Sequence, residues 1–294
     1  MIRIGYPCIN LSLECRGTKT FRLHSYSRER LRLTVRNNLD CLAETVNWNI
    51  EHGIGFFRIS SDLVPFAAHP VNTYPWYLVF ARRFRQIGKL IRKSGMRISM
   101  HPDQFVLLNA KDDRIIQDSI RELVYHCRVL DLLGLDRSAK VQIHLGGVYG
   151  DKRASLERFV RVYHRLPAAV RRRLVIENDD RLYNVADCLA VSAETGIPVV
   201  FDSFHHEVNG DGSDWRTAFE RCAVTWRRRD GLPMVDYSSQ LSGARPGTHA
   251  RHIDSEHFRR LLAALAGYDF DLMLEIKDKE RSALVAQRLL GGKF

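Results

Sequence analysis

The sequence predicts a (β/α)₈ TIM barrel, an α/β fold, and three observations lead to this fold class. Short apolar runs alternate with longer amphipathic stretches along all 294 residues, which is the pattern of repeated strand–helix units. Eight such units can be counted, and eight is the number that closes a barrel. No linker, low-complexity run or change of composition marks a domain boundary, so residues 1–294 are expected to form a single domain.

Each predicted strand is a short apolar run of the kind that is buried on both faces of a parallel sheet. We expect strands at 2–6, 56–59, 97–101, 141–144, 174–177, 197–202, 234–237 and 272–276. The runner-up architecture is an open doubly wound sheet. It would need a glycine-rich dinucleotide turn, and Gly146-Gly147 follows a histidine and does not have that spacing.

Each predicted helix follows one of these strands and shows a helical apolar period. Ser27 can cap the first helix, and Gly53, Gly95 and Gly196 each follow a predicted helix end. The helices are expected at 27–52, 76–94, 112–134, 153–165, 185–195, 215–222, 253–265 and 279–290.

Composition and charge limit the class of protein. The net charge of +11 favours a polyanionic partner such as nucleic acid. No apolar run approaches the roughly 18 residues that span a membrane, and the N-terminus has the pattern of a strand and not of a signal peptide. We therefore expect a cytoplasmic protein without a membrane partner. The six cysteines have no short paired spacing, which argues against a disulfide framework and a cysteine zinc site.

Histidines and carboxylates occur where the predicted strands end. In a TIM barrel all these ends open onto one face, which holds the active site. Buried carboxylates are costly without a cation, so a metal cluster explains the set together, although any one histidine alone would be an ordinary surface or core residue. The set is His101, His144, Glu177, Asp202, His205, Asp236 and Glu275, with His249 in the loop after the seventh strand.

Eight candidate ligands exceed the needs of one ion, so we expect two or three ions that share bridging carboxylates. Nitrogen and oxygen ligands without a thiolate fit Mn²⁺ or Zn²⁺ better than copper. Such ions lower the pKa of a bound water and neutralise charge on a phosphoryl group.

The chain resembles the UV damage endonucleases over nearly its whole length, and a series of motifs in a fixed order carries the resemblance. The motifs are IGYPCIN at 4–10, RI at 58–59, PFAAHP at 65–70, SMHPDQ at 99–104, HLGG at 144–147, ENDD at 177–180, DSFHH at 202–206, PGTH at 246–249 and EIK at 275–277. The barrel and metal arrangement of that family is also similar to the endonuclease IV class of abasic-site nucleases.

The resemblance implies a DNA repair nuclease that uses Mn²⁺-type ions to cut the backbone immediately 5′ of pyrimidine dimers and photoproducts. It implies that Glu177, Asp202 and Glu275 are catalytic. By resemblance His101, His144 and Glu177 would hold one ion, Glu177, Asp202 and Glu275 a second, and His205 and His249 a third.

Two departures from the family pattern affect these expectations. Where the family has Lys-x-His, this chain has Met234-Val235-Asp236, so a thioether replaces the lysine and a carboxylate replaces a histidine ligand. Phe105 stands after Gln104 where the family has tyrosine, which keeps the wedge and the stacking surface and removes the hydroxyl.

Contact with damaged double-stranded DNA is expected at the same face. By resemblance Tyr6, Asn10 and His69 line the lesion pocket, and Gln104 with Phe105 inserts into the duplex. Without the resemblance, barrel packing for Tyr6 and a loop cap for Asn10 would be favoured. The mouth also offers basic side chains for phosphates at Lys19, Arg22, Arg181 and Arg245, whereas the arginine runs 171–173 and 227–229 are expected to be solvated faces.

The sequence therefore predicts a monomeric, metal-dependent endonuclease. The alternatives are a sugar isomerase or epimerase with a similar barrel, a damage-binding protein whose metal site is impaired by Met234 and Asp236, and a nuclease that prefers abasic sites. The net charge and the pair Gln104-Phe105 argue against the isomerase.

Overall fold

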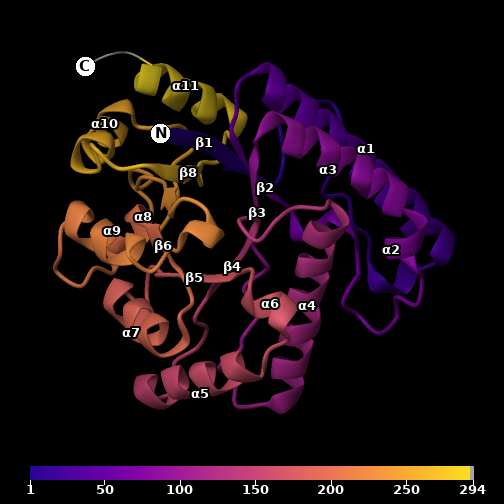
Figure 1. Cartoon of the computed structure of the whole chain (residues 1–294), viewed down its shortest axis with the longest axis horizontal. Coiled ribbons are helices and arrows are strands. Elements are labelled where there is room, and N and C mark those ends of the chain that lie inside the picture. The colour runs from indigo at the N-terminus through magenta and orange to yellow at the C-terminus, as the bar shows by residue number, and fades with distance from the viewer. Residues whose placement is uncertain (292–294) are drawn as a thin grey trace.

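Eight parallel strands close into one barrel in the computed structural model, which describes residues 1–291 (Figure 1). Each strand pairs with the next one in the sequence, and β8 pairs with β1 to complete the circle. This confirms the predicted fold class, with strand ends that shift by at most two residues. The strands are β1 (Ile2–Pro7), β2 (Phe56–Ile59), β3 (Arg97–Met100), β4 (Lys140–His144), β5 (Leu174–Glu177), β6 (Val199–Asp202), β7 (Met234–Tyr237) and β8 (Phe270–Leu274).

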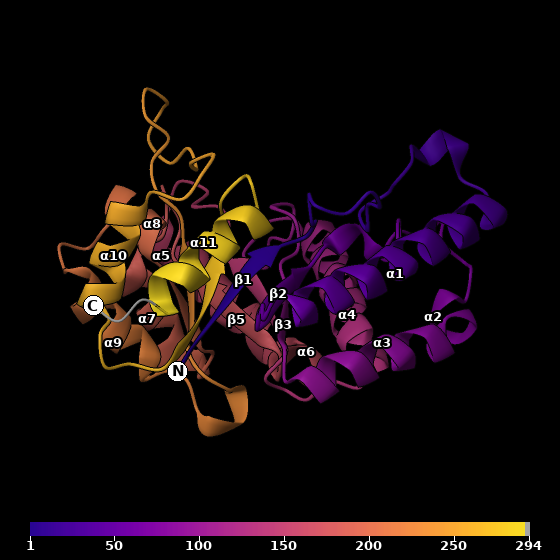
Figure 2. The same ribbon diagram turned by 90° about the horizontal axis from the view of Figure 1, so that it is seen from above.

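Helices surround the barrel, and α1 and α3 lie side by side along one flank (Figures 1 and 2). Among the described residues no helix has the length and apolar character needed to cross a membrane. The helices are α1 (Arg28–Glu51), α2 (Trp76–Val79), α3 (Ala81–Ser94), α4 (Asp113–Leu132), α5 (Lys152–Arg165), α6 (Ala168–Arg171), α7 (Val185–Thr195), α8 (Ser203–Val208), α9 (Trp215–Ala223), α10 (Ser255–Ala264) and α11 (Glu280–Gly291).

The predicted capping residues lie at the helix ends where they were expected. The Ser27 side chain accepts a hydrogen bond from the backbone N–H of Arg30 and so caps α1. Gly95 and Gly196 end α3 and α7 in the left-handed region, with φ of 71° and 70°, which only glycine adopts without steric cost. The single helix predicted for 76–94 is divided instead, because Phe80 has φ −99° and ψ 8° and separates α2 from α3.

The barrel interior consists of layers, because residues two positions apart on a strand face the same side. A middle layer of buried apolar side chains separates the two polar ends of the barrel. Its members are Phe56, Val175, Val200, Met234 and Met273, with Trp226. The residues two positions further along the strands form the layer above, at the carboxyl ends. Met234 therefore belongs to the apolar layer, and Asp236 is the residue of its strand that faces the upper layer.

The lower end of the barrel is closed by a buried ionic layer. Asp271 on β8 is buried, and its carboxylate accepts hydrogen bonds from Arg97 Nη1 at 2.7 Å and from Arg3 Nη2 at 2.7 Å. Beside it Lys140 Nζ lies 2.6 Å from Asp230 Oδ1. These contacts join β1, β3, β4 and β8 at the end opposite the candidate site.

One of the two arginine runs differs from the prediction of a solvated face. Arg171 and Arg172 are exposed, but Arg173 is buried. Its guanidinium donates to the backbone carbonyls of Leu135 and Ala139 at 2.7 and 3.0 Å and to Asp131 at 2.7 Å. It is buried because it satisfies carbonyls of the loop that follows α4. The residues 227–229 are exposed, as predicted.

A disulfide joins Cys15 to Cys41, which corrects the prediction that the cysteines form none. It links the loop after β1 to α1, across a sequence separation of 26 residues. Short spacings along the chain cannot reveal such a pair, because the two cysteines meet only after α1 packs against the barrel. Three other cysteines, Cys127, Cys188 and Cys222, are free and buried in the core.

Removing this disulfide should lower the free energy of unfolding. Closing a loop of this length restricts the unfolded chain by about 3 to 4 kcal/mol in the chain-entropy model. The double variant Cys15→Ser/Cys41→Ser should lose about 2 to 4 kcal/mol in urea denaturation without reductant. Wild-type protein in reductant should match the double variant, and an unchanged wild-type transition on adding reductant would contradict the prediction.

Candidate metal centre

The predicted ligands meet at the carboxyl ends of the strands. His144, Glu177 and Asp202 are the last residues of β4, β5 and β6. His101 directly follows β3, Glu275 directly follows β8, and Asp236 lies within β7. The parallel barrel thus places residues from six strands around one mouth, as the sequence predicted.

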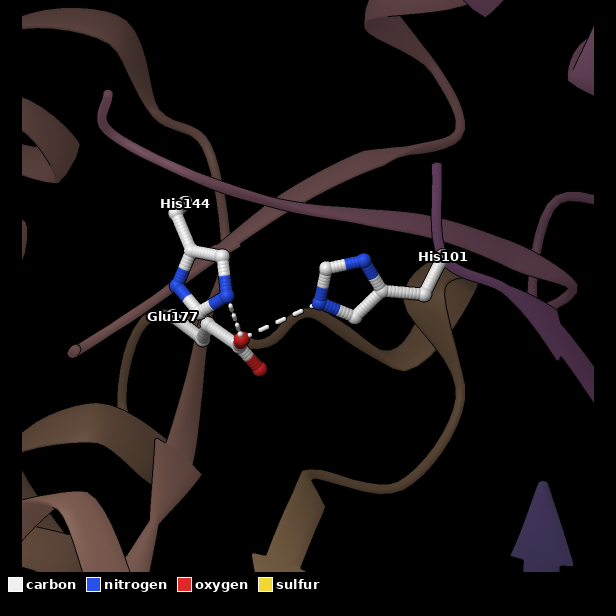
Figure 3. Close-up of side chains that lie close together, drawn as sticks. All are labelled: His101, His144 and Glu177. Carbon is white, nitrogen blue, oxygen red and sulfur yellow. Dashed lines mark hydrogen bonds and ion pairs between the residues drawn. The ribbon is translucent and has the colours of Figure 1, made fainter. Parts of the chain in front are cut away.

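The first group consists of His101, His144 and Glu177 (Figure 3). The Nε2 atoms of His101 and His144 lie 3.1 and 2.8 Å from the same oxygen, Oε1 of Glu177. The two imidazoles and the carboxylate each offer one ligand atom, and these atoms lie within 4.8 Å of one another. Two imidazole nitrogens and one carboxylate oxygen form a donor set that suits Zn²⁺ or Mn²⁺.

The second group consists of the carboxylates of Glu177, Asp202 and Asp236, which also have ligand atoms within 4.8 Å of one another. All three residues are buried. Asp202 is held in place because it caps α8, where its Oδ1 accepts from the backbone N–H of His205 at 2.7 Å. Glu177 belongs to both groups, which is the position required of a bridging ligand.

Three of the histidines are fixed in one tautomer by the backbone. Their Nδ1 atoms lie 2.8 Å from the Pro102 carbonyl for His101, 3.0 Å from that of Asn178 for His205, and 2.7 Å from that of Glu275 for His249. A carbonyl can only accept, so each Nδ1 carries the proton and the neutral ring keeps its lone pair on Nε2. A backbone carbonyl at the far nitrogen is the usual partner of a metal-binding histidine.

The charges of the mouth also fit a cation. Burial raises the pKa of Asp202 to about 6, and the carboxylates of Glu275 and Glu177 add to the rise, although His205 opposes it. Burial likewise raises the pKa of Asp236, against the effect of Arg58. For Glu177 the histidines His144 and His101 outweigh burial and hold the pKa well below its ordinary value. The mouth thus has a surplus of negative charge that a divalent ion would relieve.

The predicted third pair, His205 and His249, lies next to these groups. Their ring centroids are 5.9 Å apart. Within residues 1–291 the two groups described above are the only clusters of three or more donors, and neither contains both histidines. A third ion therefore stays a prediction.

A hollow of about 580 Å³ lies over these residues and gives access to them. Its lining includes Arg58, His101, His144, Glu177, His249 and Glu275. A second hollow of about 480 Å³ adjoins it and shares His101, His144 and Arg245 with the first. Arg245 is thus a basic side chain at the boundary of both hollows, where the sequence predicted phosphate contact.

Tyr6 and Asn10, which the resemblance assigns to a lesion pocket, are both buried in this structure. The Tyr6 ring is buried against Phe57, with ring centroids 5.2 Å apart. Its hydroxyl donates to Asn49 at 2.6 Å and accepts from the buried Asn10 amide at 2.8 Å. In this structure the Tyr6 ring is part of the barrel packing, and the Asn10 amide donates one hydrogen bond within the same network. The lesion contacts expected of both residues stay predictions.

The other predicted DNA contacts remain accessible. His69 and Gln104 are exposed, and Phe105 has 75% of its surface exposed although it is a large apolar residue. A single exposed apolar side chain is common on protein surfaces, so the exposure of Phe105 is compatible with a wedge but does not assign one. These three assignments stay predictions.

Sequence analysis missed two site residues, Arg58 and Gln142. Both are buried inside the barrel, and Arg58 Nη2 lies 3.1 Å from Gln142 Oε1. The signal for them was present: each is a polar residue in an otherwise apolar strand, at an inward-facing position. Arg58 entered the sequence analysis only as part of a family motif.

The fold and the site define a TIM-barrel protein with a candidate metal centre at the carboxyl ends of its strands. The chain belongs to the family described as UV-endonuclease UvdE, which matches residues 2–291. A UV DNA damage endonuclease from Clostridium perfringens (strain 13 / Type A) is 34% identical over 285 residues, covering 96% of this chain and 69% of the relative.

One solved structure of the same family matches this chain closely, and a more distant one shares its barrel. The crystal structure of SacUVDE matches with a TM-score of 0.95 and 42% identity, covering 99% of this chain and 98% of that chain. Endonuclease IV from Thermus thermophilus aligns with a TM-score of 0.60 and 18% identity, covering 99% of this chain and 100% of that chain. The second likeness shows a shared barrel alone.

Proposed function

We propose that this protein is a metal-dependent DNA repair endonuclease that cuts the phosphodiester backbone immediately 5′ of UV photoproducts. The observation that carries the proposal is the cluster of His101, His144 and Glu177, in a chain that belongs to the UV-endonuclease family. The net charge of +11 fits a DNA partner. We further propose that the protein acts as a single barrel domain and a monomer.

The proposed ligand sets are those that the resemblance to the family implies. His101, His144 and Glu177 would hold one ion, Glu177, Asp202 and Glu275 a second, and His205 with His249 a third. Divalent ions of the Mn²⁺ or Zn²⁺ kind, when bound, lower the pKa of water and neutralise charge on the phosphoryl group.

The protein side chains would orient the ligand atoms and keep water out of the barrel interior. The backbone carbonyls behind His101, His205 and His249 fix each ring so that Nε2 is the free donor. The apolar layer beneath the carboxylates closes the barrel to water from below. Arg245 at the boundary of the two hollows would hold a backbone phosphate over the mouth. No protein side chain in the mouth is assigned as a separate general acid.

The test is incision of an end-labelled duplex that carries a single cyclobutane dimer, with Mn²⁺ and with chelator. A cut immediately 5′ of the dimer that requires the ion is the expected result. Binding to the dimer without a cut would favour a damage-binding protein, and a cut at an abasic site alone would favour the other class of lesion. Neither binding nor cutting, together with turnover of a free keto sugar, would favour the isomerase.

Phe105→Ala should weaken binding to the damaged duplex by about tenfold, because base–aromatic stacking contributes roughly 1 to 3 kcal/mol. The fold should be unaffected, since the ring is 75% exposed. Fluorescence anisotropy with damaged and undamaged duplexes measures the change. Val224→Ala is the matched control, because that side chain is 82% exposed on α9's C-terminal end. Equal affinity of Phe105→Ala and wild type for the dimer would exclude the wedge.

A further inference from the structure

We propose that Arg58 is a built-in counter-ion of the metal centre: it keeps Asp236 out of the coordination of the ions and orients Glu275 toward them. This inference rests on the proposed metal dependence. It differs from the expectation drawn from sequence, in which Asp236 replaces a histidine as a metal ligand.

The first argument is the set of contacts that Arg58 makes. Its side chain extends from β2 into the barrel and is almost completely buried, with 3% of the residue exposed. Nη2 donates to both oxygens of Asp236, at 3.0 Å to Oδ1 and 2.8 Å to Oδ2. Nη1 donates to Oε1 of Glu275. One guanidinium therefore binds two carboxylates of the mouth from within the protein.

The second argument concerns the oxygens that remain free. Gln142 Nε2 donates to Oδ2 of Asp236 at 2.5 Å and also to Oε2 of Glu177. Both oxygens of Asp236 thus have protein donors. By contrast, Glu177 is bound from below through Oε2 only, and its Oε1 faces the two histidines. Glu275 is bound from below through Oε1, and its Oε2 lies on the side of His249, 4.0 Å from Nδ1.

Arg58 and Gln142 therefore form a platform beneath the metal residues. Arg58 donates to one oxygen of Glu275, and Gln142 donates to one oxygen of Glu177. The other oxygen of each glutamate is left for an ion, so each carboxylate would bind an ion through one oxygen. Asp236 is the part of this platform that neutralises Arg58. For Asp236 to become a ligand, an ion would have to compete with its buried ion pair to Arg58, which would leave Glu275 as the remaining carboxylate partner of the guanidinium.

The charges lead to the same assignment. Four carboxylates, Glu177, Asp202, Asp236 and Glu275, surround the mouth, and Arg58 is a fixed cation among them. An arginine guanidinium is effectively always protonated in proteins, so Arg58 carries its charge beside Asp236 and Glu275. Met234, the other departure from the family pattern, lies in the apolar layer and supplies no charge. Arg58 is thus the internal cation of the platform.

The test counts the ions bound to the intact, DNA-free protein, with Mn²⁺ as the probe. Electron paramagnetic resonance of free Mn²⁺ gives the number of ions per chain. Asp236→Asn should bind as many ions as wild type, whereas Asp202→Asn, the matched change in the same mouth, should bind at least one fewer. Loss of an ion in Asp236→Asn would overturn this inference alone. Absence of Mn²⁺ binding in wild type would overturn it together with the metal dependence.

A second variant keeps the inference testable if Asp236→Asn does not fold. Arg58→Met/Asp236→Leu removes the whole ion pair and fills its place with apolar side chains, a replacement that buried pairs often tolerate. This double variant should unfold at a higher temperature than Arg58→Met alone and should keep the wild-type number of Mn²⁺ ions. A double variant that folds and binds fewer ions than both wild type and Arg58→Met would show that Asp236 is a ligand, because Arg58→Met already lacks the guanidinium that holds Glu275.

Discussion

Glu177→Gln is expected to abolish incision while the protein remains folded. Glu177 is the residue that belongs to both donor groups, and its Oε1 lies within 3.1 Å of two histidine nitrogens. An amide has the same shape but carries no charge and binds a divalent ion poorly. We therefore expect the rate of incision to fall by roughly 10³-fold or more, since the loss of a bridging carboxylate removes more than one ion from its position.

The measurement is single-turnover cleavage of the dimer-containing duplex in Mn²⁺, together with binding of the same duplex. Affinity for DNA should persist, because backbone contacts come from basic side chains around the mouth. Glu157→Gln on α5 is the matched control, as that carboxylate is 52% exposed and should leave cleavage unchanged. Cleavage by Glu177→Gln at a rate near that of wild type would exclude Glu177 as the bridging ligand.

The architecture and the location of the site could be predicted because both depend on patterns that run along the chain. Alternation of apolar runs with amphipathic stretches identified all eight strands, and parallel strands bring their carboxyl ends together. A histidine at the end of β4 and a glutamate at the end of β5 must then face the same mouth. The residues His144 and Glu177 were found in this way, without knowledge of a distance between them.

The features that escaped prediction depend on contacts between distant parts of the chain. The role of Arg58 depends on its contact with Asp236, which lies on another strand of the barrel and 178 residues away in sequence. The disulfide of Cys15 and Cys41 requires α1 to be in place. The hydrogen bond from the Tyr6 hydroxyl to Asn49 likewise forms only when α1 is in place.

The buried platform also explains why a polar residue inside a strand is informative. In a TIM barrel the inward positions of the strands are filled by layers of side chains, most of them apolar. Arg58 and Gln142 depart from this rule at the upper layer, beside the candidate metal ligands. Arg97 and Asp271 depart from it at the lower layer, where their ion pair closes the end of the barrel. The same departure thus serves the site at one end and stability at the other.

Asp271→Asn should lower the free energy of unfolding by about 3 to 5 kcal/mol, the usual effect of breaking a buried ion pair from one side. Asp271 is completely buried and accepts from Arg97 at 2.7 Å. Arg97 is also buried, so without the carboxylate its charge would remain in the lower layer with only backbone carbonyls, those of Asp230 and Leu232, as partners. An asparagine of the same shape cannot supply the lost charge.

The neighbouring residue Asp269 offers the control for this change. Its carboxylate pairs with the N-terminal amine of Met1 but is 61% exposed, so Asp269→Asn should change the free energy of unfolding by no more than about 1 kcal/mol. Urea denaturation followed by circular dichroism compares the two variants with wild type. Equal losses in both variants would mean that the contacts of Asp271 with Arg97 and Arg3 contribute no more than an ion pair at the surface. A large loss in Asp271→Asn alone would show that this ionic layer holds the lower end of the barrel together, far from the metal residues.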